Sequence, residues 1–402
     1  MSQPKGSVIG GMLLITGSCV GAGMLGLPIL TGIAGFFPAL FMFIVAWLFM
    51  TFTGLLLLEV NGWFSPKSHY ISMTEKFFGK FGKIASWILY LFLFYALLVA
   101  YVSGSGSLVS SAFGSAIPDW AGSLFFVVLF SFVVYMGTKK VDVWNRYLMA
   151  GKILCYLGLV LLGFKFLNPK LLLHSKASYA VIALPLLVTS FGFHNMIPSL
   201  TAYFDGDLKK VRMTIWGGST LALMIYIIWE IVVLGIVPLE GTGGIVDSLS
   251  QDKEASQAIS AILGVSLAST FAQGLAFFAI LTSFLAQALS LVHFLADGFK
   301  VKTEGAKENP WLCALTLAPP LILSIIYPEL FFKALSFAGG FCAVILFGIF
   351  PVWMVWKGRR QNLPSTYQIF GGWKLLIVIL LLSFFILCFQ LATMFGMNLQ
   401  PA

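Results

Sequence analysis

Charged side chains are scarce in this sequence. Asp, Glu, Lys and Arg make up 10% of the 402 residues and 59% are hydrophobic, whereas a soluble chain has about a quarter charged residues. Apolar runs of about 20 residues, the length that a helix needs to cross a bilayer, recur along the whole chain. No polar stretch between them is large enough for a soluble domain. The composition therefore excludes a soluble protein and predicts an all-α polytopic membrane protein with one membrane domain over residues 1–402.

Residue types that bind metals or catalyse reactions are also few. The four histidines are scattered without clustered carboxylates, and the sequence contains no G-x-x-x-x-G-K-[ST] phosphate-binding loop. We therefore expect no enzymatic activity, no metal, no cofactor and no direct use of ATP. The odd number of cysteines, without a C-x-x-C pair, predicts buried thiols rather than disulfides. All of them fall in apolar segments, at Cys19, Cys155, Cys313, Cys342 and Cys388.

Hydropathy predicts about eleven membrane-spanning helices. The eighth of these apolar stretches is longer than one straight crossing requires. The predicted spans cover residues 8–31, 33–60, 84–112, 121–138, 147–167, 178–202, 213–238, 259–295, 310–327, 332–356 and 374–396.

The net charge of +9 does not indicate nucleic-acid binding, because the positive residues sort by side of the membrane. With the N-terminus inside, eighteen of the 24 Lys and Arg residues fall on the cytoplasmic side and five on the outer side, while Lys152 lies within a span. Three of the five outer lysines lie in the loop 165–176, against the general bias. An odd number of spans then predicts a cytoplasmic N-terminus and an outer C-terminus.

Two Gly-containing interruptions lie near the middle of apolar spans. The first is the run 17–23, Gly-Ser-Cys-Val-Gly-Ala-Gly, and the second is the run 189–194, Thr-Ser-Phe-Gly-Phe-His. Non-helical backbone at membrane depth is tolerated only where it is buried in protein or lines a cavity. A pair of such breaks at corresponding places in two halves points to a transporter binding site.

The breaks divide the chain into two groups of five spans. The first group covers residues 8–167, the second covers 178–356, and the helix at 374–396 is left over. Because five is odd, the second group enters the membrane from the opposite side. This arrangement predicts inverted repeats whose broken helices meet at the midplane.

The first break has residue types that suit a zwitterion. A half-helix that begins near Gly23 presents free N–H groups and a positive dipole end to a carboxylate. The half-helix that ends near residues 16–17 offers carbonyls to an ammonium group, and the second break offers more near residues 189–191. The alternative is that the glycines only allow close helix packing, but the matched pair of breaks favours a site.

Aromatic side chains lie beside these breaks. Phe191 and Phe193 flank Gly192, and Tyr95 and Tyr101 lie in the third span. Aromatic walls around a zwitterion site would favour an aromatic substrate through stacking. The chain has 39 Phe residues, most of which must face lipid or core, so this indication alone is weak.

Several strings resemble the bacterial aromatic amino-acid permeases, the tyrosine- and tryptophan-specific group of the amino acid–polyamine–organocation superfamily. The resemblance covers essentially the whole chain and is closest to the tyrosine-specific members. Its most specific string is Thr-Ser-Phe-Gly-Phe-His. The strings are residues 17–25 with Pro28, 55–60, 95–104, 189–194 with Pro198 and Ser199, and 205–212.

The resemblance implies an eleven-span protein of the bacterial inner membrane, with a LeuT-like core of five plus five inverted-repeat helices. It implies uptake of an aromatic amino acid driven by the proton gradient. By position, the amides of Gly21, Ala22 and Gly23 would hold the substrate carboxylate. Carbonyls near Cys19 and Ser190 would hold the amine, with Phe191, Phe193 and His194 beside the aromatic ring or its gate.

Ionisable residues within spans are candidates for ion coupling, because burying a charge in the membrane is costly. Related proton-coupled carriers have a lysine on the fifth span where sodium-coupled carriers bind an ion, so Lys152 resembles a stand-in cation; the alternative is a lysine snorkelling to the interface. Glu230 departs from the family pattern, and we predict that it needs a partner. His194 could titrate near neutral pH, or have a hydrogen-bonding role.

The residues leave several alternatives open. Thr282 and Ser283 lie where hydroxyls bind sodium in sodium-coupled relatives, whereas an ammonium at Lys152 would compete for that pocket. A sodium-coupled or exchange-type carrier, a tryptophan-preferring permease and, from another class, a channel are the alternatives to proton-coupled import of tyrosine. The sequence does not determine the oligomeric state.

Overall fold

A computed structural model describes residues 7–66, 68–113, 116–301, 307–364 and 367–396, and the regular elements within these ranges are all helical. The first span is broken, as predicted, into α1 (Val8–Cys19) and α2 (Gly23–Gly32). The two half-helices are bent by 58° relative to each other. The first half-helix ends at Cys19, slightly later than the predicted end near residues 16–17.

The second broken span is built differently. It begins with the 3-10 helix η3 (Ala177–Ala183) and continues as α7 (Leu184–Ser190). The chain then leaves helical geometry until α8 (Met196–Tyr203). The interruption therefore falls within the predicted 189–194 run and extends one residue beyond it.

The other elements of the first half lie close to the predicted spans. The fourth helix begins before the predicted 84–112 span, and Gly79, at φ 66°, kinks it between the early segment and the apolar span. These elements are α3 (Phe36–Asn61), α4 (Tyr70–Ala112), α5 (Asp119–Tyr135), α6 (Thr138–Gly163) and the 3-10 helices η1 (Phe164–Phe166) and η2 (Pro169–Leu173).

In the second half, the predicted 259–295 span is long because it joins two elements. A short helix ends at Leu263, and the long apolar helix begins at Leu267. The tenth span is continuous from residue 331 to residue 360 but contains a π-helix, η4. The elements are α9 (Leu208–Ile236), α10 (Ile245–Ser250), α11 (Ala255–Leu263), α12 (Leu267–Phe299), α13 (Pro310–Ile326), α14 (Phe331–Phe337), η4 (Ala338–Ile349), α15 (Phe350–Arg360) and α16 (Gly372–Met394).

Seven helices in the described ranges are long and apolar enough to cross a membrane, or eight if the bent α1–α2 pair is one span. Three predicted spans fall on shorter apolar helices, at residues 119–135, 177–190 and 310–326. The prediction of an all-helical polytopic membrane protein is confirmed. The full count of eleven crossings and the inverted repeat remain predictions.

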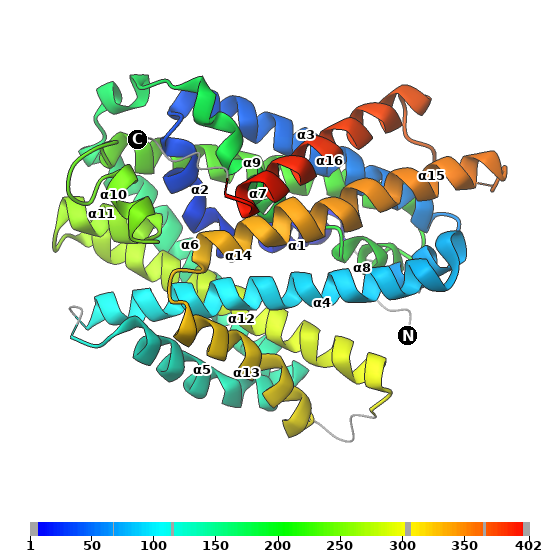
Figure 1. Cartoon of the computed structure of the whole chain (residues 1–402), viewed down its shortest axis with the longest axis horizontal. Helices are drawn as coiled ribbons and strands as arrows, with labels where there is room; N and C mark the ends of the chain where they lie inside the picture. The colour runs from blue at the N-terminus through cyan, green and yellow to red at the C-terminus, as the bar shows by residue number, and fades with distance from the viewer. Residues whose placement is uncertain (1–6, 67, 114–115, 302–306, 365–366, 397–402) are drawn as a thin grey trace.

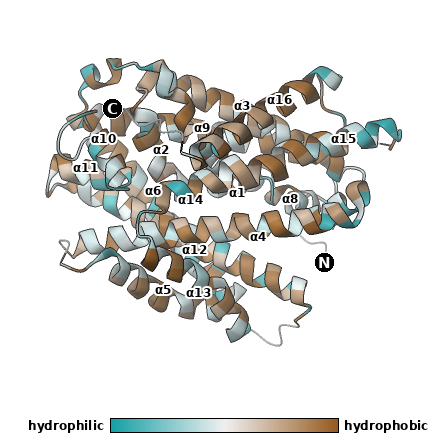
Figure 2. Cartoon of the chain, in the orientation of Figure 1, coloured by the Kyte–Doolittle hydropathy of each residue, from teal (hydrophilic) through white to brown (hydrophobic). Residues whose placement is uncertain are grey.

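The helices form two groups that meet along α4 and α12. Figure 1 shows α4 and α12 side by side across the molecule, with α5 and α13 on one side and α1, α3, α9, α15 and α16 on the other. In Figure 2 hydrophobic residues cover the lengths of the helices, and hydrophilic residues gather at the end of α15 and around α10 and α11. The hydropathy pattern thus separates an apolar belt from two polar ends.

Two carboxylates, the fully buried Glu59 and the partly exposed Asp252, fix segments at these polar ends. Glu59, at the end of α3, forms a bidentate pair with Arg359 of α15, with both N–O distances 2.7 Å, and accepts from the Ile369 amide at 2.9 Å. At the other end, Asp252 accepts from the Phe331 and Phe332 amides at 2.8 and 3.3 Å and so caps the start of α14. Both carboxylates join elements that are distant in the sequence.

Candidate functional site

A cavity of about 310 Å³ lies where the two breaks meet α4, α6 and α12. Eight of the predicted site residues line it, and five do not: Ala22, Phe191, Phe193, His194 and Glu230. The eight are Cys19, Gly21, Gly23, Tyr101, Lys152, Ser190, Thr282 and Ser283.

The cavity opens along α1 and is closed on the α2 side. Leu13 and Leu14 of α1 line it and are 59% and 46% exposed. All ten residues of α2 are buried. A ligand can therefore reach the breaks from the end of the molecule where α1 begins.

The amides of the first break are partly used within the chain. The Gly21 amide donates to the Cys19 carbonyl at 2.7 Å, and the Ala22 amide donates to Ser283 Oγ of α12 at 3.1 Å. Ser283 is therefore held directly against the break. A ligand carboxylate would have to take the Ala22 amide from Ser283.

Glycine is required at positions 21 and 23 because side chains from other helices approach the backbone closely. A Cβ on Gly21 would lie 2.6 Å from Ser283 Oγ, and a Cβ on Gly23 would lie 2.8 Å from Ser190 Oγ. Real Cβ atoms do not sit this close to another heavy atom, so a side chain at either position would force Ser283 or Ser190 to move. The two glycines thus let the breaks approach each other and α12.

The carbonyls predicted to hold an amine are bridged by a tyrosine that the sequence analysis missed. The Tyr226 hydroxyl of α9 lies 2.6 Å from the Cys19 carbonyl and 2.8 Å from the Ser190 carbonyl. It therefore bridges the C-terminal ends of α1 and α7. Its only sequence signal is a tyrosine within an apolar span, because a buried hydroxyl needs a partner.

Lys152 reaches the first break from α6. Its Nζ donates to the Val20 carbonyl at 2.7 Å and lies 3.5 Å from Thr282 Oγ1 of α12, and the residue is 4% exposed. The ammonium is thus held by a break carbonyl and a hydroxyl. This geometry differs from snorkelling, in which the charge extends to the membrane interface.

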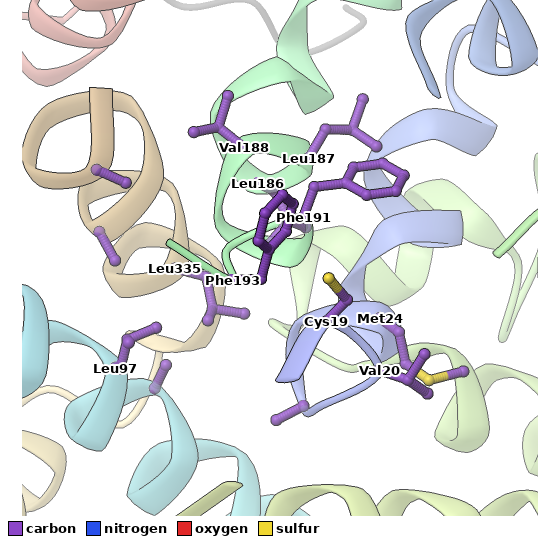
Figure 3. Packing of buried hydrophobic residues seen from close by; sticks show 14 of the residues in the cluster. Cys19, Val20, Met24, Leu97, Leu186, Leu187, Val188, Phe191, Phe193 and Leu335 are labelled. Atoms are coloured by element: carbon purple, nitrogen blue, oxygen red, sulfur yellow. The ribbon is translucent and has the colours of Figure 1, made fainter. Parts of the chain in front are cut away.

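The aromatic residues of the second break face the protein core. Figure 3 shows Phe191 and Phe193 among the buried side chains of α7, near Cys19 and Met24. The Phe191 ring is 5.0 Å from the Tyr226 ring, centroid to centroid. The predicted aromatic wall at positions 191 and 193 is therefore a packing layer behind the cavity.

His194 is fully buried between two rings. Its centroid is 5.0 Å from that of Phe193 and 4.7 Å from that of Phe347 in stacked geometry, and its Nε2 is 2.9 Å from Thr53 Oγ1 of α3. Of these rings, only Phe347 lines the cavity. His194 thus does not line the cavity but packs against Phe347, which does.

Glu230 lies on α9, outside the cavity lining. It is 1% exposed, and its Oε1 is hydrogen-bonded to the Thr31 hydroxyl of α2. At the preceding position, the Trp229 indole donates to the Met24 carbonyl at 2.9 Å. Adjacent residues of α9 therefore hold α2 at two points.

The sequence matches the tryptophan/tyrosine permease family over residues 4–390. It is 33% identical over 386 residues to tyrosine-specific transport system 1 of Haemophilus influenzae, which covers 93% of this chain and 94% of the relative. It is 30% identical over 389 residues to the tryptophan-specific transport protein of the same bacterium, with 92% of each chain covered. The low affinity tryptophan permease of Escherichia coli strain K12 is 29% identical over 398 residues, again with 92% of each covered. The chain, with its two broken helices around one cavity, belongs to the tryptophan/tyrosine permease family.

Proposed function

We propose that this protein is a secondary active transporter that imports an aromatic amino acid together with a proton. Family membership supports transport of tyrosine or tryptophan, and the higher identity to a tyrosine-specific relative favours tyrosine. The observation that carries the proposal is the cavity at the junction of the two breaks, with Lys152 bound to the Val20 carbonyl.

The substrate site is assigned to the lining of this cavity. The Gly23 amide at the start of α2 holds the carboxylate, together with the Ala22 amide, which lies outside the lining and becomes free only when Ser283 releases it. The carbonyls of Cys19 and Ser190 hold the amine, taking the place of the Tyr226 hydroxyl. The aromatic ring lies toward Tyr101, which lines the cavity with Phe347.

Coupling is assigned to Lys152. A proton on its Nζ makes a cation that binds the Val20 carbonyl of the first break, so protonation links the position of the break to the proton gradient. The alternative of sodium coupling has one supporting observation, the hydroxyls of Thr282 and Ser283 beside the break. Because the Lys152 ammonium already lies 3.5 Å from Thr282 Oγ1, it competes with sodium for that place.

The proposed architecture follows the sequence prediction. Three shorter apolar helices complete eleven crossings, and the two groups of five are inverted repeats of a LeuT-like core with α16 as the extra helix. Lys and Arg bias supports an N-terminus in the cytoplasm of a bacterial cell and a C-terminus outside the inner membrane. The cavity, open along α1, then faces the cytoplasm, and alternating access rocks one group of helices around the breaks.

The test is uptake of labelled tyrosine into proteoliposomes under an imposed inward proton gradient in sodium-free buffer. Concentrative uptake that an aromatic competitor blocks better than leucine supports the proposal, and unlabelled tryptophan and phenylalanine rank the substrates. Uptake that requires sodium would transfer coupling to Thr282 and Ser283. Exchange without concentrative uptake, in folded protein, would replace symport by exchange.

A further inference from the structure

Glu230 is a buried carboxyl that the proposed transport site does not use. Its Oε1 meets the Thr31 hydroxyl, while its Oε2 is buried without a hydrogen-bond partner in the described part of the chain. An ionised carboxylate with an unpartnered oxygen in an apolar interior is far more costly than a neutral acid. The surroundings therefore favour a proton on Glu230.

The hydrogen bonds of Thr31 give a second, independent argument. The Thr31 hydroxyl lies 2.7 Å from the Leu27 carbonyl, which can only accept a hydrogen bond. The same hydroxyl also contacts Glu230 Oε1. A threonine hydroxyl has one proton to donate. If that proton goes to Leu27, the contact with Glu230 needs a proton from the carboxyl. A neutral Glu230 that donates to Thr31 Oγ1 satisfies the whole chain of bonds.

No cation among the described residues is positioned to neutralise Glu230. The helices α2 and α11, which pack against α9, contain no ionisable side chain. On the neighbouring elements, Tyr156 of α6 donates to the Ile225 carbonyl at 2.9 Å, His174 contacts the Ile33 carbonyl at 3.1 Å, and Lys170 of η2 is exposed.

Elsewhere on α6, Lys152 donates to the Val20 carbonyl, the Cys155 thiol lies beside Gly274 of α12, and Lys140, Asp142, Arg146 and Tyr147 are exposed. The other ionisable groups on elements that pack against α9 are engaged or lie near the ends of those elements. On α1 the thiol of Cys19 is at the break, and on α3 Glu59 is paired with Arg359. Tyr203 of α8 accepts from the Ser7 amide, and Lys165 of η1 is exposed. Within α9 itself, Tyr226 bridges the two breaks, and Lys209, Lys210 and Arg212 lie in its first turns.

We propose that Glu230 and Thr31 form a second proton-binding site, which holds α2 against α9 while the cavity is open along α1. The proton enters from the outer water while α2 is apart from α9. In the state open along α1 it passes from Oε1 to water on the cytoplasmic side and leaves a carboxylate that must be hydrated. Hydration requires α2 to move away from α9, which opens the closed side of the cavity. Proton loading of Glu230 thus selects the state described here. This inference rests on the proposed symport, which it deepens by naming a proton-carrying group besides Lys152.

The protonation state can be measured without transport. In purified protein, infrared difference spectra between acidic and alkaline buffer, in water and deuterated water, detect the carbonyl stretch of a protonated carboxyl. We expect wild type to show such a band that is absent in Glu230→Gln. Identical spectra would overturn the assignment even if transport is never observed, so this result is independent of the proposed function.

The coupling is measured by the ratio of proton flux to tyrosine flux in proteoliposomes. Glu230→Gln keeps the shape of the side chain and a donor to Thr31, so it mimics the protonated acid. We expect this variant to retain tyrosine exchange and to transport one proton fewer per tyrosine. One linked proton changes the apparent affinity for outside tyrosine by about tenfold per pH unit. We expect Glu230→Gln to lose this pH dependence. An unchanged flux ratio would overturn the proposal.

Thr31 supplies the matched controls. Thr31→Ser keeps the hydroxyl and should behave as wild type. Thr31→Val keeps the volume but removes the partner of Glu230, so we expect the carboxyl band to shift and the flux ratio to fall. Should wild type itself show no proton-driven uptake, the symport proposal fails while the infrared result still reports whether Glu230 holds a proton.

Discussion

The two breaks in this protein look alike in the sequence but are built in opposite ways. The first consists of three small or aliphatic residues, 20–22, whose backbone meets polar side chains from α6 and α12. The second, residues 191–195, turns Phe191, Phe193 and His194 into the core. Both breaks border the cavity, the second at Gly192 and Asn195, but only the second uses large rings to hold its backbone in place.

This difference predicts different roles for the two breaks. Substitutions in the first should alter ligand and ion binding, whereas substitutions of the rings in the second should alter stability. The two breaks are joined directly, because Ser18 Oγ donates to the Gly192 carbonyl at 3.2 Å and Tyr226 bridges Cys19 and Ser190.

The largest effect is expected at Gly23. Gly23→Ala places a methyl group 2.8 Å from Ser190 Oγ, so the Ser190 hydroxyl must leave its place beside the first break and tyrosine binding should be lost. The next nearest atoms of Ser190 are 3.7 Å away, an ordinary contact. The double variant Gly23→Ala with Ser190→Gly should therefore recover binding, measured by ligand-induced thermal stabilisation. Wild-type affinity in Gly23→Ala alone would contradict the site assignment.

The second-largest effect is expected for Lys152→Ala. Removal of the ammonium leaves the Val20 carbonyl without its donor, so we expect at least about tenfold less accumulation under a proton gradient, equivalent to about 1.4 kcal/mol. Counterflow exchange should be partly retained, because the amides and carbonyls of the breaks remain. Full pH-driven accumulation in this variant would remove Lys152 from the coupling mechanism.

Tyr226→Phe tests the bridge between the breaks. The ring that packs on Phe191 stays, but the Cys19 and Ser190 carbonyls lose the one hydroxyl proton that they share. This loss should cost about 1–3 kcal/mol of stability and change tyrosine affinity. Tyr156→Phe is the matched control, since its hydroxyl donates to the Ile225 carbonyl, away from the breaks. If both variants change affinity equally, the bridge has no special role.

Phe193→Leu should affect stability but not selectivity. Phe193 is fully buried and stacks on His194, and a core truncation of this kind costs about 1–3 kcal/mol. Because the ring does not line the cavity, the ranking of tyrosine, tryptophan and phenylalanine as competitors should stay the same. A changed ranking of the competitors would indicate that Phe193 of the second break contacts the substrate.

The smallest effect on transport is expected at Asp252, which caps α14 next to the second break. Burial raises the pKa of this carboxyl from 3.8 to about 6. Stability from this group is therefore fully present below about pH 4 and is lost as pH rises through about 6, by at most about 3 kcal/mol. Asp252→Asn should make the thermal unfolding temperature less dependent on pH over that range. The pH dependence that remains toward pH 7 comes from Glu254, because burial raises the pKa of that carboxyl to about 7. An unchanged slope would contradict this reading.

The sequence predicted what depends on local composition. Helical spans follow from apolar length, and both breaks follow from residues that interrupt that length. It could not predict Tyr226, Thr31 or Arg359, because their partners are more than 30 residues away in the chain and are brought near by helix packing. It also could not distinguish a ring that lines a cavity from one behind it, since both occupy the same apolar segment.

The buried pair of Glu59 and Arg359 has a practical consequence. Because the same carboxylate also accepts from Ile369, it ties the end of α3, the end of α15 and the approach to α16 into one corner. Motion around the breaks would leave this corner undistorted. Spectroscopic labels on exposed residues there would provide a stationary reference, against which displacements of α1 and α2 could be measured during a transport cycle.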